Sequence, residues 1–155
     1  LDLFEQLVDD LNKRVRQAMR DGAEGATTRL DAERGGFRGF FRFTQEHPAL
    51  YRIIRQAEFV SPEMLRLHYT RIVDGYEAGL RAAQREGDVD EALDPEVTAW
   101  ALMGAGELIG MRYLLWERDE QDNAPSAMPE AVIDHMTRFI RNALEPRRTS
   151  GGSHD

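Results

Sequence analysis

Apolar residues recur at intervals of three and four along most of the chain, which is the spacing of one face of an α-helix. No segment shows the strict alternation of apolar and polar residues that is typical of a half-buried strand. The pattern predicts an all-α, bundle-like domain of six helices. Their expected ranges are about 1–19, 28–46, 48–60, 62–85, 94–116 and 129–144.

Helix-capping residues, prolines and glycines set the expected ends of these helices. Ser61-Pro62 and Asp94-Pro95 each combine an N-cap residue with a proline at the first helical position, so both should open a helix. Gly87 should close the fourth helix, because glycine adopts the left-handed backbone at little cost. We expect one domain over residues 1–145, an exposed polar connection at 117–126 and a disordered tail at 146–155.

The glycine- and phenylalanine-rich run at 35–43, Gly-Gly-Phe-Arg-Gly-Phe-Phe-Arg-Phe, is unusual inside a helix. Three glycines weaken the helix where four aromatic rings need a place to pack, so a kink or distortion is expected. Two interpretations remain open at this stage. The rings pack in the core while the glycines make room for neighbouring helices, or the run forms one wall of a ligand cavity.

The helix expected at 94–116 is apolar around its whole circumference, interrupted only by Glu107 and Arg112. Such a helix should be buried on every side. Its interior also contains three glycines, Gly104, Gly106 and Gly110. Because glycine lowers the stability of a helix, their presence suggests that another backbone or a ligand approaches closely. A single chain of this size has few helices with which to surround it, so we expect a second copy of the chain to cover part of it.

The composition and net charge of the chain indicate which kinds of partner it can bind. With 41% apolar and 31% charged residues the chain is typical of a globular protein, and it has no cysteine for a disulfide or a thiolate metal site. No apolar run is long enough to span a bilayer, and no membrane partner is expected. A net charge of −8 would repel a polyanion, so direct DNA binding by these residues is not expected.

Catalytic and metal-binding motifs are missing from the sequence. The histidines are scattered, no HExxH, phosphate loop or dinucleotide fingerprint is present, and the serines have the positions of caps or of the tail. We therefore predict that the chain is not an enzyme and that it needs no metal or cofactor.

Four residues allow both a structural and a ligand-binding interpretation. His68 is either a core histidine bonded to a neighbour or a polar contact for a bound molecule. Glu107 needs a cation, several donors or a proton if it is buried, so it either pairs with an arginine of another helix or meets a ligand or water in a cavity. Trp100 and Met103 are either core residues or part of a binding site.

The order of these parts resembles the C-terminal regulatory domain of tetracycline-repressor (TetR) family transcription regulators. The resemblance covers nearly the whole chain, to about Leu144, and depends on a few segments: Leu3-Phe4 and Leu7-Val8, Phe43-Thr44-Gln45-Glu46-His47-Pro48-Ala49-Leu50-Tyr51, Glu86-Gly87-Asp88, Asp94-Pro95-Glu96 and the Ala/Gly/Leu-rich helix that follows. The N-terminal helix-turn-helix of that family is absent from this sequence.

The resemblance implies a cytoplasmic homodimer in which the helices at 94–116 and 128–144 of both subunits form a four-helix interface. It implies an effector cavity among the preceding helices, and DNA binding, most often as a repressor, only through the missing N-terminal domain. The interface residues expected on this basis are Gly106, Gly110, Tyr113, Val132, His135, Met136 and Phe139.

Aromatic and thioether side chains are the expected walls of the cavity, and they suit a small apolar or aromatic effector. The candidate ligand-binding residues are Phe37, Phe40, Phe41, Tyr51, Phe59, His68, Tyr69, Ile72, Tyr76, Trp100, Met103 and Glu107. The alternative is a helical dimerisation or scaffold module with a solid core and no small-molecule ligand.

Overall fold

The computed structural model describes residues 2–116 and 127–147 of the chain. Within these ranges the protein is helical and contains no strand, which confirms the predicted all-α class. The elements are α1 (Asp2–Gly22), α2 (Arg29–Glu46), α3 (Pro48–Val60), α4 (Pro62–Glu86), α5 (Pro95–Gly110), the π-helical η1 (Met111–Trp116) and α7 (Glu130–Leu144). The predicted connection at 117–126 and most of the predicted tail lie outside the described residues.

Helix ends follow the predicted capping chemistry with one exception. The Asp94 side chain accepts a hydrogen bond from the Val97 backbone N–H at 2.9 Å, and Gly87 has the left-handed φ of 81° that closes α4. The helix α4 also opens at Ser61-Pro62 as predicted, but the Ser61 side chain makes no capping bond. Its hydroxyl instead donates to the Glu5 carboxylate on α1 at 3.4 Å, so a tertiary contact replaces the local one.

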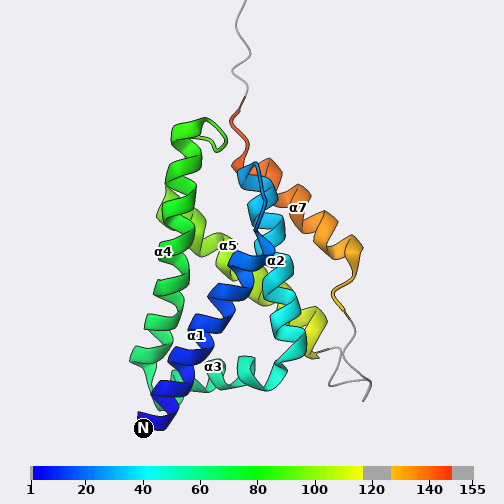
Figure 1. The fold of residues 1–155 in the computed structure, drawn as a ribbon. Helices are drawn as coiled ribbons and strands as arrows, with labels where there is room; N and C mark the ends of the chain where they lie inside the picture. Colours follow the sequence, from blue (N-terminus) through cyan, green and yellow to red (C-terminus); the bar gives the residue numbers. More distant parts are fainter. Residues whose placement is uncertain (1, 117–126, 148–155) are drawn as a thin grey trace, which may run out of the picture.

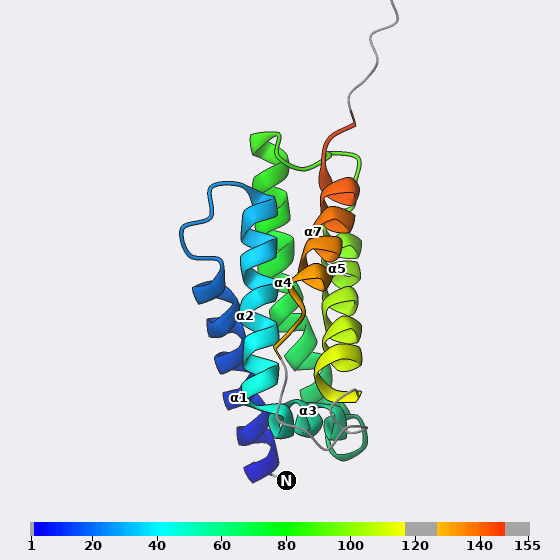
Figure 2. The ribbon, with the colours of Figure 1, turned by 90° about the vertical axis from the view of Figure 1, so that its right-hand side faces the viewer.

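Most of the helices run along the length of the molecule, and α3 lies across the end at which α1 begins (Figure 1). Figure 2 shows α5 and α7 along the same edge of the molecule, running in opposite directions. The closest neighbours are α1 with α2 and α4 with α5, while α7 packs against α2. None of the helices in residues 2–116 and 127–147 is both long and apolar enough to cross a bilayer.

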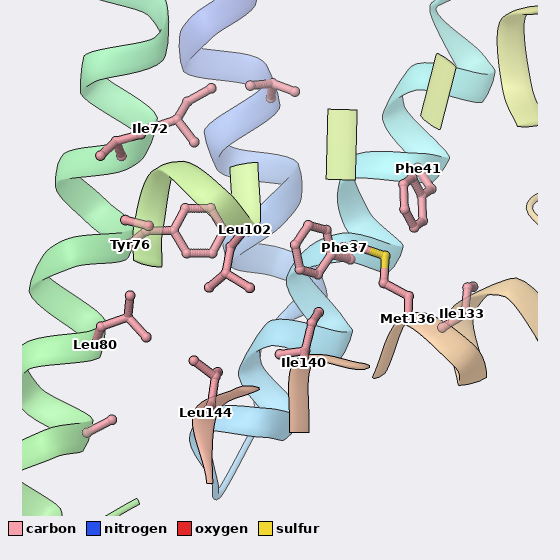
Figure 3. Close-up of a cluster of buried hydrophobic side chains, with 14 of the residues drawn as sticks. Phe37, Phe41, Ile72, Tyr76, Leu80, Leu102, Ile133, Met136, Ile140 and Leu144 are labelled. Carbon is pink, nitrogen blue, oxygen red and sulfur yellow. The ribbon is translucent and has the colours of Figure 1, made fainter. Parts of the chain in front are cut away.

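The main hydrophobic core lies where α2, α4, α5 and α7 meet (Figure 3). At its centre the Phe37 ring lies 6.1 Å from the Phe41 ring and 6.3 Å from the Tyr76 ring, distances at which aromatic rings attract one another. Leu80 and Ile140 are almost completely buried beside them. Each such side chain contributes about 1.5–3 kcal/mol on burial, so this core fixes α7 against the rest of the chain.

The glycines of the 35–43 run bring α1 and α2 into direct backbone contact. A Cβ added at Gly35 would overlap the Gly22 carbonyl, and one added at Gly39 would overlap the Ala18 carbonyl. The helix α2 nevertheless continues without interruption to Glu46, so the predicted distortion is not observed. Glycine spacing at i and i+4 here permits close helix packing instead of bending the helix.

The helix α5 is covered by its own chain on one side only, in line with the expectation that a single chain of this size cannot surround it. Val97, Trp100 and Leu108 are 67%, 44% and 58% exposed, whereas Ala99 and Leu102 on the opposite side are buried. The reason is that α4 and α2 cover only one side of α5. The predicted α-helix also ends early, since Met111–Trp116 is π-helical.

Candidate functional site

A small cavity lies between α1, α2, α3, α4 and α5. Its volume is about 30 Å³, which is enough for a water molecule. Its lining is mostly apolar, with a few polar side chains that converge from different helices. The lining residues are Leu11, Val15, Phe40, Phe43, Thr44, Leu50, Tyr51, Ile54, His68, Tyr69, Ile72, Met103 and Glu107.

Seven of the twelve predicted ligand-binding residues lie in this lining. They come from four helices and include most of the polar candidates: Phe40, Tyr51, His68, Tyr69, Ile72, Met103 and Glu107. The aromatic and thioether walls expected from the sequence therefore enclose one shared space.

The other five predicted residues lie elsewhere. Phe37, Phe41 and Tyr76 belong to the main core, because they occupy the faces of α2 and α4 that meet α7 and α5. Phe59 is 86% exposed near the end of α3, and Trp100 is exposed on the uncovered side of α5. These five residues do not line the cavity, because aromatic character alone does not say which neighbour a helix face will meet.

Glu107 joins the cavity to an ion pair. Its carboxylate accepts a hydrogen bond from the Tyr69 hydroxyl at 2.7 Å and lies 3.4 Å from the Arg55 guanidinium of α3, and its side chain is only 14% exposed. The first of the two interpretations of Glu107 is observed, since it pairs with an arginine of another helix, and the same residue also lines the cavity. A carboxylate held by two donors has a fixed position from which it can accept from a ligand.

Two buried hydroxyls in the cavity wall have no hydrogen-bond partner among residues 2–116 and 127–147. They are Thr44 Oγ1 and the Tyr51 hydroxyl. Burial, and then the nearby Glu107 charge, raises the pKa of Tyr51 well above its usual range, so this hydroxyl keeps its proton. An unsatisfied buried hydroxyl costs about 1–3 kcal/mol, which a water or a polar group of a ligand would recover.

His68 is held in one neutral form. Asn12 Nδ2 lies 2.9 Å from the His68 carbonyl oxygen and 3.1 Å from His68 Nδ1. Because an amide nitrogen only donates, Nδ1 must accept and the ring proton lies on Nε2. Burial, and then the Arg16 charge, lowers the pKa of His68 to about 4. The cavity is therefore lined at this point by a neutral imidazole.

Neither a scan against models of known protein families nor a search of the curated proteins finds a match to this chain. The resemblance to the TetR regulatory domain stays a prediction. What the chain can bind is therefore inferred from its own side chains. Within the described part of the chain, no group of three or more acidic, histidine or cysteine side chains is arranged to hold a metal ion.

Several lining residues were missed by the sequence-based list. Leu11 and Val15 belong to the apolar stripe of the first helix, and nothing in the sequence separates them from ordinary core residues. Thr44 is a polar residue on a buried face of α2, four residues after Phe40. That spacing places both on the same side of the helix and could have identified Thr44.

A second feature is an uncovered apolar surface on α5 and α7, which we call the outer flank. It consists of Val97, Trp100, Ala101, Gly104 and Leu108 of α5 with His135 and Phe139 of α7, all exposed. Val97 and Phe139 are the most exposed of its large apolar side chains, at 67% each. Exposed apolar residues gathered in this way commonly mark a contact surface.

The predicted interface residues divide between the two sides of these helices. His135 and Phe139 lie on the outer flank, and Tyr113 and Val132 are half-buried. Gly106, Gly110 and Met136 are instead buried inside the single chain. Their assignment to the interface is corrected, because Gly106 contacts the Phe37 ring, Gly110 contacts Phe40, and Met136 lies in the main core.

Proposed function

We propose that this chain is the effector-binding and dimerisation domain of a TetR-like transcription regulator that acts as a repressor. The observation that carries the proposal is the cavity between α1 and α5, in which apolar walls surround convergent polar groups. A binding site of this composition suits small organic molecules. The full protein would contact DNA through an N-terminal helix-turn-helix that this sequence does not include.

The chemistry of the wall defines the effector. Ile72, Met103 and Phe40 supply apolar contacts, so most of the molecule should be apolar or aromatic. The free hydroxyls of Thr44 and Tyr51 can each donate or accept one bond. We therefore expect an effector with one hydroxyl, carbonyl or amine group that replaces a water at these hydroxyls.

The volume of the cavity indicates how such a molecule would act. At about 30 Å³ the cavity is far smaller than a site for a drug-sized ligand, which is typically about 300 Å³ or more. An effector must therefore favour an arrangement in which the surrounding helices lie further apart. A ligand that binds only this wider arrangement shifts the population toward it, and the change in α1 would alter the spacing of the two DNA-binding domains.

The outer flank supports the dimeric part of the proposal. A second copy of the chain would cover Val97, Leu108 and Phe139, which are the side chains that water now surrounds. Because the flank includes parts of both α5 and α7, two copies related by a two-fold axis would form a four-helix interface.

Thermal denaturation against a panel of small aromatic and aliphatic compounds tests the ligand. An effector should raise the Tm of the wild-type chain, and Met103→Trp should abolish this rise by filling the cavity. The control Leu67→Trp adds the same side chain at a partly exposed position of α4 outside the cavity and should keep the rise. A rise that survives Met103→Trp would place the ligand elsewhere and contradict the proposal.

A scaffold module with a solid core is the second candidate, and the small volume of the cavity favours it. The scaffold function predicts the same dimer as the regulatory function, so measuring the oligomeric state does not distinguish the two. Absence of any Tm rise across the panel, together with a stable dimer, would favour the scaffold. Binding of a single compound that Met103→Trp abolishes would exclude it.

A further inference from the structure

A second hollow, separate from the cavity, lies between α1, α2 and α4 and has a volume of about 300 Å³. We call it the arginine groove, because four of its lining residues are arginines in a chain whose net charge is −8. The rest of the lining is small or apolar apart from one carboxylate. The groove is lined by Arg16, Met19, Arg20, Ala23, Arg29, Ala32, Glu33, Gly36, Arg71, Gly75 and Tyr76.

Two of the four guanidinium groups are neutralised by carboxylates of the protein. Arg29 Nε donates to Glu33 Oε1 at 2.8 Å, and Arg71 forms an ion pair with Asp9. The other two have only neutral partners within the described residues. Arg16 Nε donates to Asn12 Oδ1 at 2.9 Å, and Arg20 donates to Gln17 Oε1 at 2.7 Å. The groove therefore keeps two positive charges that pair with no carboxylate of residues 2–116 and 127–147.

Arg16 and Arg29 are held in place before any ligand arrives. The Asn12 amide that accepts from Arg16 is itself fixed by its two bonds to His68. The guanidinium of Arg29 lies 5.9 Å from the centre of the Tyr76 ring, in space that exists because residue 79 is glycine. Side chains that are already ordered lose little entropy when they bind, so this arrangement favours recognition of an anion.

Glu33 adds an independent sign of a missing partner. It is completely buried, and Oε2 of its carboxylate has no hydrogen-bond partner among the residues described. Burial raises the pKa of Glu33 despite the adjacent Arg29. An unpaired carboxyl oxygen is costly inside a protein and needs a donor or its own proton, and only the protonated form of Glu33 can donate to an anion in the groove.

We propose that the arginine groove binds a small organic anion, a phosphate monoester or a carboxylate attached to an apolar body. Arg16 and Arg20 contact the charged group, because charge-assisted hydrogen bonds from guanidinium to oxyanions are the strong ones. Met19, Ala32 and the Tyr76 ring contact the apolar body. The inference does not depend on the proposed regulatory role, since the cavity and the arginine groove share no lining residue.

Isothermal titration calorimetry of the full chain with phenyl phosphate, benzoate and inorganic phosphate tests the proposal. Phenyl phosphate or benzoate should bind more tightly than inorganic phosphate, and the affinity should fall as salt is added. The double variant Arg16→Gln/Arg20→Gln should weaken binding at least about tenfold, because both charge-assisted bonds to the anion are lost. The exposed Arg20→Gln alone, which is not expected to disturb folding, should show part of this loss.

The matched control is Arg66→Gln/Arg85→Gln, which removes the same charge from exposed positions of α4 outside the groove. It should keep the wild-type affinity. Three results would overturn the proposal: no heat of binding for either organic anion at millimolar concentration, unchanged affinity in both Arg20 variants, or an equal loss in the control.

Discussion

The two sides of α5 differ in what they contact, although both are apolar. On the inner side, Gly106 lies against the Phe37 ring and Gly110 against Phe40, while Leu102 is buried. On the outer side, Val97 and Leu108 are mostly exposed.

On the inner side, α5 has glycines at the points where the phenylalanine rings of α2 pack against it. On the outer side, α5 has large side chains that no other described part of this chain covers. An apolar circumference therefore does not require that the helix's own chain buries every side of it. A single chain needs only one side of such a helix, and the other side is available for association.

The largest expected effect is on association. The double variant Val97→Asp/Leu108→Asp would place two carboxylates in the proposed interface, where an unpaired buried charge costs several kcal/mol. We expect the dimer to weaken by about a hundredfold or more in analytical ultracentrifugation, with helicity by circular dichroism unchanged. Phe59→Asp, at an 86% exposed position of α3, is the control and should remain dimeric. A monomeric wild-type protein would contradict the assignment of the outer flank.

The next effect is on the pH dependence of stability, and its cause is the buried imidazole of His68 in the cavity wall. The pKa of His68 falls from its usual 6.5 to about 4 on folding, so below 6.5 the unfolded chain binds more protons than the folded one. Stability should therefore decrease as the pH falls from 6.5 toward 4, by about 2 kcal/mol between pH 6.5 and about pH 5. Urea unfolding across this range measures the slope. His68→Gln should make the slope shallower, and an unchanged slope would mean that other groups cause it.

A matched pair of glycines tests the two sides of α5 directly. A Cβ at Gly106 would overlap the Phe37 ring, whereas a Cβ at Gly104 would have nothing within 4 Å. Gly106→Ala should lower the free energy of unfolding by about 1–2 kcal/mol through overpacking. Gly104→Ala should raise it by about 0.5–1 kcal/mol through helix propensity. Equal effects at the two positions would show that both sides have the same room.

The smallest effect distinguishes the two tyrosines of the cavity wall. Tyr69→Phe removes the hydroxyl that donates to Glu107 and should cost about 1 kcal/mol. Tyr51→Phe removes a hydroxyl without a partner in the described chain, so it should be neutral or slightly stabilising. Thermal unfolding of both variants measures the difference. A larger loss for Tyr51→Phe would reveal a partner for its hydroxyl, such as a bound water.

Local sequence signals are enough to place most of the helix ends. Thr28 and Asp94 cap helices with their own side chains, and Gly87 closes one, because these bonds join residues only a few positions apart. The all-α class follows from the same local information. Much of the cavity was also predictable, since Tyr51, Tyr69 and other polar or aromatic residues lie on apolar helix faces where they need a partner.

Only the tertiary structure decided which side of each helix meets which neighbour. Phe40 lines the cavity while Phe37 and Phe41 fill the core, and Ser61 bonds to Glu5 instead of capping its own helix. The four guanidinium groups of the arginine groove come together from three separate helices. The physical reason is that rotating an all-apolar helix about its axis changes no local interaction. The orientation of such a helix is therefore fixed by the shapes and charges of segments far away in the sequence. One example is the Phe37 ring, which lies so close to Gly106 that a Cβ there would overlap it.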